Sequence, residues 1–134
     1  MRYLVVGLGG FLGANARYIV GGWVQQRWGS SFPYGTFVIN VSGSYILGLF
    51  ATLALGLTWH DNWRLLFAIG FVGAYTTFST FEYETLRLMA DGNRLNAAAI
   101  NILGSVIAGL FAVYLGVVTA RLILQSGIHR IGGG

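Results

Sequence analysis

Four long apolar segments leave this chain very few folds to choose from. Each is near the length of about 20 residues that spans a bilayer, and only short polar connections separate them. In lipid every backbone N–H and C=O must be bonded internally, so segments of this length cross as α-helices. Only 9% of the residues are charged, whereas about 25% is usual for a soluble domain. We expect an all-α membrane protein with four transmembrane helices, at Tyr3–Trp28, Gly35–Trp59, Trp63–Met89 and Leu95–Ile123.

The rest of the composition excludes several classes of function. The length of 134 residues fits one domain, placed at 1–128, with 129–134 as a tail outside it. The chain has no cysteine, which excludes disulfides, thiol catalysis and thiolate metal sites. Its arginines are scattered, so nucleic-acid binding has no support. His60 and His129 lie far apart in sequence and form no catalytic set, and we predict that the protein is not an enzyme.

The arginines do not specify an orientation in the membrane. With four spans, the N-terminus, the second connection and the C-terminus share one side of the membrane. The arginines of that side are Arg2, Arg64, Arg121 and Arg130, and those of the other side are Arg27, Arg87 and Arg94. An excess of Lys and Arg marks the inner side, and these counts are nearly equal. We therefore expect a chain that inserts both ways and forms a dual-topology antiparallel homodimer.

The first segment imitates a cleavable signal peptide. Arg2, the apolar run after it and Ala14-Asn15-Ala16 give the pattern of a charged start and a small-residue cleavage site. The many small residues weaken the hydrophobic region, and apolar sequence resumes directly afterwards, so we expect the segment to remain in the protein. The spacing of Gly9 and Gly13 is typical of a close helix–helix contact.

The third segment contains a stretch, residues 70–81, that is unusually polar for a membrane span. Its hydroxyl side chains are those of Thr76, Thr77, Ser79 and Thr80. An unpaired hydroxyl costs free energy in lipid, so these groups should face protein, water or an ion. Gly70 and Gly73, followed by two adjacent β-branched threonines, predict a break near the middle of the helix, where freed carbonyls can hold an ion. The alternative is a close helix contact in which the threonines bond back to carbonyls one turn earlier.

Two other segments carry an Asn four residues before a Ser, which places both side chains on one helix face. These pairs are Asn40 with Ser44 and Asn101 with Ser105. Hydrogen bonding between helices explains a single such pair, but two pairs in one small protein suggest a polar track. The second segment opens at Pro33, and Thr36 is its expected helix cap.

Charged and aromatic side chains complete the candidate site. Arg17 lies well inside the first segment, where it either marks a wet vestibule that favours anions or snorkels to the headgroups. Glu84 either relays a proton or lies near the surface with Arg87 as its partner. Phe78 and Phe81 fit a helix core or lipid contact, but the positive edge of a phenyl ring can also lie beside an anion.

Four motifs in order resemble those of the CrcB, or Fluc, family of fluoride channels. The resemblance covers nearly the whole chain, and the third motif is the most specific. The matching stretches are Gly9-Gly10-Phe11-Leu12-Gly13-Ala14-Asn15-Ala16-Arg17-Tyr18, Pro33-Tyr34-Gly35-Thr36-Phe37-Val38-Ile39-Asn40-Val41-Ser42-Gly43, Gly70-Phe71-Val72-Gly73-Ala74-Tyr75-Thr76-Thr77-Phe78-Ser79-Thr80-Phe81 and Asn101-Ile102-Leu103-Gly104-Ser105.

The resemblance implies a function and a role for each candidate residue. It implies a passive fluoride channel of the bacterial inner membrane, a dual-topology homodimer with two pores that lets cytoplasmic fluoride out. Phe78 and Phe81 would line the pore with their ring edges, and Asn40 would donate to the ion. The hydroxyl and amide track would continue through Ser79, Thr80, Asn101 and Ser105. Carbonyls of Gly73 and Thr76 from both subunits would hold a structural sodium ion, and Arg17 and Glu84 would lie toward the vestibule.

Two positions depart from the family pattern, and two rival functions remain. Glu82 stands where small residues are common, and Gly109 lacks a hydroxyl expected in the track.

One rival is a proton-coupled exporter of the small multidrug resistance type, which needs a carboxylate deep in the first helix; segment one has none. The other is a membrane assembly subunit without transport, which would tolerate similar-sized replacements of Asn40 and Phe81.

Overall fold

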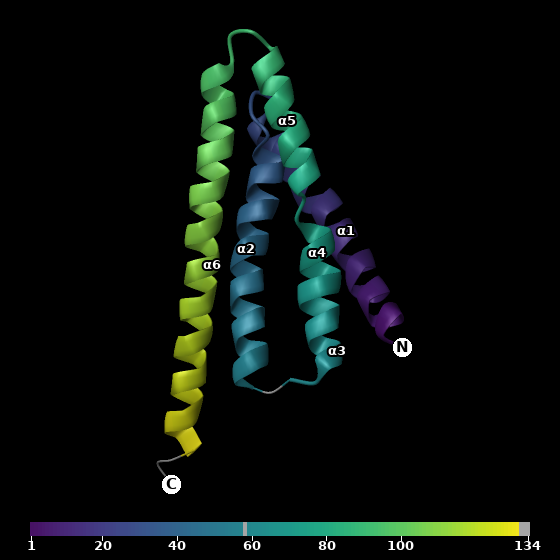
Figure 1. The fold of residues 1–134 in the computed structure, drawn as a ribbon, viewed down its shortest axis with the longest axis vertical. Helices are drawn as coiled ribbons and strands as arrows, with labels where there is room; N and C mark the ends of the chain where they lie inside the picture. The colour runs from purple at the N-terminus through teal and green to yellow at the C-terminus, as the bar shows by residue number, and fades with distance from the viewer. Residues whose placement is uncertain (58, 132–134) are drawn as a thin grey trace.

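The computed structural model describes residues 1–57 and 59–131, with side chains described as far as residue 126. The described part of the chain is helical apart from its short connections (Figure 1). The elements are α1 (Arg2–Trp28), α2 (Tyr34–Gly56), α3 (Asp61–Arg64), the π-helix η1 (Leu65–Val72), α4 (Gly73–Tyr75), α5 (Phe78–Ala90) and α6 (Leu95–Ile131).

Four stretches of the described chain are long and apolar enough to cross a bilayer, which confirms the predicted spans. They are Arg2–Trp28, Tyr34–Gly56, Asp61–Ala90 and Leu95–Ser126. The third span is assembled from α3, η1, α4 and α5 in succession. Most of the large apolar side chains on these spans are exposed in the single chain, as expected for surfaces that face lipid or another protein.

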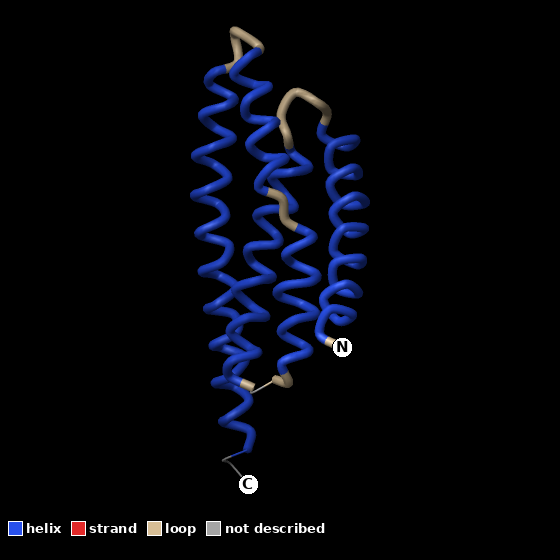
Figure 2. Tube along the Cα trace, turned by 45° about the vertical axis from the view of Figure 1, so that its right-hand side comes forward, coloured by secondary structure: helices blue, strands red, loops and turns tan. Residues whose placement is uncertain are grey.

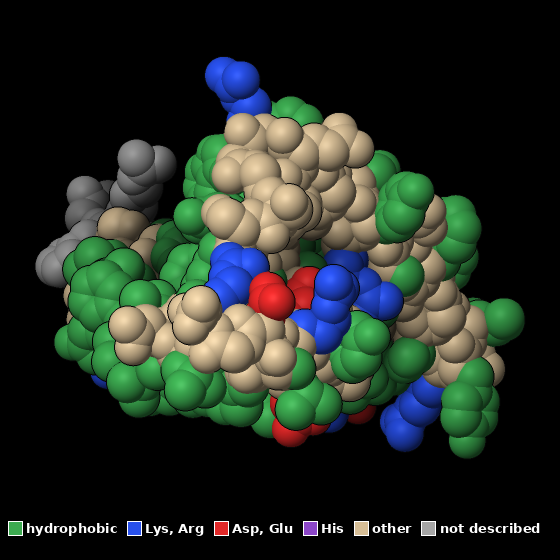
Figure 3. All heavy atoms as spheres, turned by 90° about the horizontal axis from the view of Figure 1, so that it is seen from above, with side chains coloured by type: hydrophobic (Ala, Val, Ile, Leu, Met, Phe, Trp, Pro, Cys, Tyr) green, Lys and Arg blue, Asp and Glu red, His purple; other side chains and the backbone are tan. Residues whose placement is uncertain are grey.

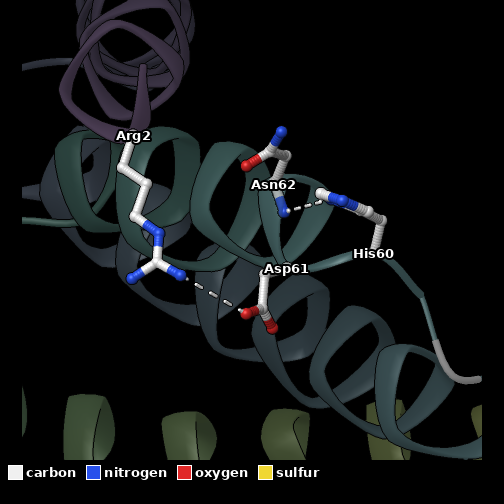
Figure 4. A network of polar contacts seen from close by, with 4 residues as sticks. All are labelled: Arg2, His60, Asp61 and Asn62. Carbon is white, nitrogen blue, oxygen red and sulfur yellow. Dashed lines mark hydrogen bonds and ion pairs between the residues drawn. The ribbon is translucent and has the colours of Figure 1, made fainter.

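The two ends of the bundle carry the connections that the arginine analysis predicted. Figure 1 shows the N-terminus and the α2–α3 connection at one end, with α6 descending to the same end. The guanidinium of Arg2 lies 3.9 Å from the carboxylate of Asp61, and both side chains are exposed (Figure 4). Next to this contact, the imidazole of His60 accepts the backbone N–H of Asn62 and caps α3.

Glycines allow α1 to lie directly against the third span. A Cβ added to Gly9 would lie 2.2 Å from the carbonyl oxygen of Leu66, and one added to Gly13 would lie 2.1 Å from that of Phe71. Both distances are far below van der Waals contact, so only glycine permits this approach. The close helix contact predicted from the spacing of Gly9 and Gly13 is confirmed.

The third span is interrupted at the predicted place. Between α4 and α5, Thr76 (φ −80°, ψ 157°) and Thr77 (φ −149°, ψ 113°) have extended backbones. Figure 2 shows this interruption as a short loop segment between two helical pieces. The hydroxyl of Thr76 also donates to the carbonyl of Val72 at 3.0 Å, so the back-bonding that was the alternative interpretation occurs together with the break.

Two expected boundaries differ from the structure. The predicted cap at Thr36 is wrong, because α2 begins at Tyr34 and no side chain of its own caps it. Instead, the carboxamide of Gln25 in α1 accepts the N–H of Gly35 at 3.0 Å and donates to the carbonyl of Phe32 at 3.0 Å, which performs the capping task from another helix. At the other end of the chain, α6 continues past Ile123 to residue 131, into the predicted tail.

Candidate functional site

A side chain of α2 pairs the backbone at the break. The carboxamide oxygen of Asn40 accepts the N–H of Thr77 at 2.8 Å, and its nitrogen donates to the carbonyl of Thr77 at 3.0 Å. Buried backbone groups without partners are costly, and an amide offers both a donor and an acceptor. Asn40 therefore replaces, from outside the helix, bonds that a continuous third span would make within it.

A first cavity of about 290 Å³ opens beside this contact. Four of the predicted pore residues line it, namely Asn40, Phe78, Phe81 and Ser105. The two phenyl rings have centroids 5.7 Å apart and are tilted by 35°. The hydroxyl oxygen of Ser105 is buried and has no hydrogen-bond partner among the described residues. The cavity is thus lined by two phenyl rings, the amide of Asn40 and a serine whose hydroxyl has no partner among the described residues.

A second and larger cavity of about 910 Å³ contains the other hydroxyls of the polar stretch. Ser79, Thr80 and Arg17 line it together with Glu84. Thr77 lines both this cavity and the first, and its hydroxyl donates to that of Thr80 at 2.9 Å. Ser79 and Thr80 were predicted to form one track with the phenylalanines, but within a single chain they border a different space.

A third cavity of about 550 Å³ lies at the end of the bundle formed by the α1–α2 and α5–α6 connections. Its charged lining residues are Glu84, Arg87, Asp91 and Arg94. Figure 3 shows acidic and basic side chains gathered around the centre of this end. Glu84 and Gln25 border both this cavity and the second, so a polar surface runs from the mouth toward the break. Glu82 is exposed and borders none of the three cavities.

Asn101 has a different environment from the other predicted site residues. It is buried, with 1% of its surface exposed, and its side-chain nitrogen donates to the hydroxyl of Thr85 at 2.8 Å. It borders none of the three cavities. Thr85 was not singled out from the sequence as a site residue, although a hydroxyl one turn after Phe81 in an apolar span was the available signal.

The backbone at the break fits a cation bound by carbonyl oxygens. The N–H of Thr77 bonds to Asn40, and the N–H of Thr80 bonds to the hydroxyl of Thr77. In a continuous helix these groups would bond to the carbonyls of Gly73 and Thr76, which therefore lose those donors. Unwound carbonyls of this kind coordinate sodium in membrane proteins. In the described part of the chain no cluster of His, Asp or Glu offers an alternative metal site.

These features define a class, that of small four-span membrane proteins with polar cavities around an interrupted helix. The sequence relationships are more specific. The chain belongs to the CrcB family, because the family model described as "CrcB-like protein, Camphor Resistance (CrcB)" matches residues 4–117. This confirms the family resemblance given by the motifs.

Similar proteins cover almost the same length. The fluoride-specific ion channel FluC of Acidobacterium capsulatum is 50% identical over 125 residues, covering 92% of this chain and 99% of the relative. FluC of Solibacter usitatus is 46% identical over 122 residues, covering 90% and 99%. FluC 1 of Methanosarcina acetivorans is 44% identical over 119 residues, covering 87% and 88%. These relatives are named as ion channels and not as enzymes, in agreement with the prediction.

Proposed function

We propose that this protein is a fluoride-selective passive channel that lets cytoplasmic fluoride leave across the inner membrane and so confers fluoride resistance. The observation that carries the proposal is the first cavity, where Asn40, Phe78, Phe81 and Ser105 come together from three helices beside the break. The relatives named as fluoride-specific channels support the choice of ion.

The chemistry of the first cavity suits a small, tightly hydrated anion. Such an ion enters a narrow passage only if hydrogen-bond donors replace its water. Asn40 uses one N–H of its amide on Thr77, which leaves the second available to the ion. The unpaired hydroxyl of Ser105 offers another donor. Phenyl ring edges carry positive potential, so Phe78 and Phe81 can border the anion without a charged side chain.

The functional unit in this proposal is an antiparallel homodimer with two pores. Phe78 is 71% exposed in the single chain although it borders the first cavity, so one chain supplies only part of a pore wall. A second copy in the opposite orientation would cover this surface. The nearly balanced arginines at the two ends of the bundle allow both orientations.

A structural sodium ion on the dimer axis completes the proposal. The carbonyls of Gly73 and Thr76 from one chain supply two ligands, so the same pair from a second copy is needed for a four-carbonyl site. Gly73 is exposed, and the nearest atom to a Cβ built on it lies 3.9 Å away, which leaves room for this approach. The ion would supply positive charge that holds the two breaks together.

Fluoride efflux from liposomes containing the purified protein tests this function. We expect rapid loss of fluoride, a far slower loss of chloride, and no fluoride loss from Phe81→Ile. Phe111→Ile is the matched control, because Phe111 is exposed on α6 and borders none of the three cavities. If liposomes containing the inserted, dimeric protein retain fluoride, the channel proposal fails and the alternatives of an exporter or an assembly subunit must be tested. The exporter alternative is already the weaker of the two, because α1 has no carboxylate side chain.

A further inference from the structure

We propose that Asn101 and Thr85 are a positioning pair that sets the spacing between Phe81 and Ser105 across the first cavity, and thereby the anion selectivity of the channel. This inference rests on the proposed function. Neither Asn101 nor Thr85 borders any of the three cavities, so they act on the ion only through other residues. Both are buried, at 1% and 6% exposed.

The two residues form a relay with a fixed direction. The amide nitrogen of Asn101 can only donate, so the hydroxyl of Thr85 must accept from it at 2.8 Å. The proton of Thr85 is then free to go to the carbonyl of Phe81, which lies 2.7 Å away. Through this relay the backbone of Phe81 in α5 is tied to α6.

The geometry of antiparallel helices carries this constraint to the cavity. Phe81 precedes Thr85 by one helical turn on the same face of α5, and Ser105 follows Asn101 by one turn on the same face of α6. The helices α5 and α6 run in opposite directions (Figure 1). Because Thr85 is bonded to Asn101, Phe81 and Ser105 therefore lie at the same level of the bundle, one turn away from that bond. Both border the first cavity, Phe81 from α5 and Ser105, whose hydroxyl has no partner among the described residues, from α6.

The break leaves the position of α5 to its contacts with neighbouring helices: Asn40 of α2 holds its first end at Thr77, and the bond to Asn101 holds it one turn beyond Phe81. Only the extended residues Thr76 and Thr77 connect α5 to the rest of the third span, so helix continuity does not fix how α5 is rotated or how high it sits. Among the described residues, Asn101 to Thr85 is the one side-chain hydrogen bond between α5 and α6. Without it, a small rotation of α5 would turn the edge of the Phe81 ring away from the ion path.

Substitutions at Thr85 separate positioning from mere stability. Fluoride and chloride fluxes are measured in liposomes for Thr85→Val, which keeps the shape and removes the hydroxyl, and for Thr85→Ser, which keeps the hydroxyl. We expect the fluoride-to-chloride flux ratio to fall about tenfold in Thr85→Val, because sites loosened by a fraction of an ångström lose function. Thr85→Ser should restore it.

The chain offers a matched control on another pair of helices. Thr119 in α6 donates to the carbonyl of Leu115 at 2.8 Å and accepts from the hydroxyl of Tyr45 in α2 at 3.4 Å. This relay has the same form and borders none of the three cavities. Thr119→Val should therefore leave the flux ratio unchanged.

A double variant, Asn101→Leu with Thr85→Val, removes both polar partners and leaves neither unpaired, so it should fold and dimerise like the parent protein. Its flux ratio should remain low, and it is measured in place of Thr85→Val if that single variant does not fold. A parental ratio in Thr85→Val or in the double variant overturns the positioning pair. A parent protein that moves no fluoride overturns the proposed function instead, so the two failures are distinguishable.

Discussion

Asn40 and Thr77 lie 37 positions apart, yet the carboxamide of one bonds to both the N–H and the carbonyl of the other. This contact gives the interruption its shape. It withdraws the N–H of Thr77 from the carbonyl of Gly73, and it occupies only one of the two amide N–H groups of Asn40, which borders the first cavity. The lining of the first cavity and the free carbonyls at the break therefore depend on the same side chain.

The first prediction concerns this contact. Asn40→Leu keeps the approximate volume but removes both hydrogen bonds, so the free energy of unfolding should fall by about 1–3 kcal/mol. Fluoride flux should be lost as well. Denaturation in detergent, followed by tryptophan fluorescence, and liposome flux measure the two effects. Asn15→Leu is the control, because Asn15 is exposed and bonds only to Phe11 in its own helix; equal effects of both variants would contradict the assignment.

The second prediction concerns the space beside the break. A Cβ on Gly43 would lie 2.3 Å from the methyl carbon of Thr76 and 3.2 Å from the ring of Tyr75. Gly43→Ala should push the break away from α2, reducing stability by about 1–3 kcal/mol through overpacking and abolishing flux.

Gly10→Ala supplies the comparison for Gly43→Ala, because nothing lies within 4 Å of a Cβ at Gly10. Alanine is the better helix former, so this change should be neutral or slightly stabilising. Melting curves and flux rates are recorded for both variants, and only Gly43→Ala should lose stability and flux. Wild-type flux in Gly43→Ala would show that the break tolerates displacement.

The third prediction is a dependence on sodium. If carbonyls of Gly73 and Thr76 from two copies bind the ion, sodium should stabilise the dimer by about 2.7 kcal/mol at a concentration 100 times the dissociation constant. The midpoint of thermal dissociation is measured with sodium and with N-methyl-D-glucamine at equal ionic strength. A midpoint that ignores the exchange of cations would rule out a structural sodium ion.

The fourth prediction concerns attraction of the anion. Arg17 borders the second cavity, so Arg17→Gln should slow fluoride flux. The slowing should be largest at low salt, because added salt screens the charge of Arg17 and the Debye length is only about 10 Å at 0.1 M. Arg27→Gln is the matched change, since Arg27 is exposed in the last turn of the same helix and borders none of the three cavities. The ratio of the two flux rates across a salt series is measured. A ratio that does not change with salt would argue against a vestibule role.

The local signals in the sequence predicted the spans and the break. Hydropathy locates the four segments, and Gly73 with the adjacent Thr76 and Thr77 marks the interruption within a residue or two. Long-range partners could not be predicted in this way. Nothing local indicates that Asn40 would bond to Thr77, or that Gln25 in α1 rather than Thr36 would cap α2, because such pairs are set by how the helices pack.

Two features of the site were also beyond local reasoning. The π-helical turns from Leu65 to Val72 look the same as an α-helix in a continuous apolar run, because periodicity is invisible when every face is apolar. Asn101 and Ser105 share one helix face, yet one is bonded to Thr85 and the other borders a cavity. The helix face predicts the direction in which a side chain points, but the neighbouring helix determines whether its polar group finds a hydrogen-bond partner.

The groups that pair the interruption are neutral, and this matters for how the chain is made. Between residues 35 and 81 the only Asp, Glu, Lys or Arg residues are Asp61 and Arg64, both in or next to the connection between the two spans. An acidic or basic side chain at the centre of a span would raise the cost of insertion by about 2.5–3.5 kcal/mol. Amides and hydroxyls avoid that cost, so the newly synthesised hairpin can enter the membrane without burying a charged side chain at the level of the break.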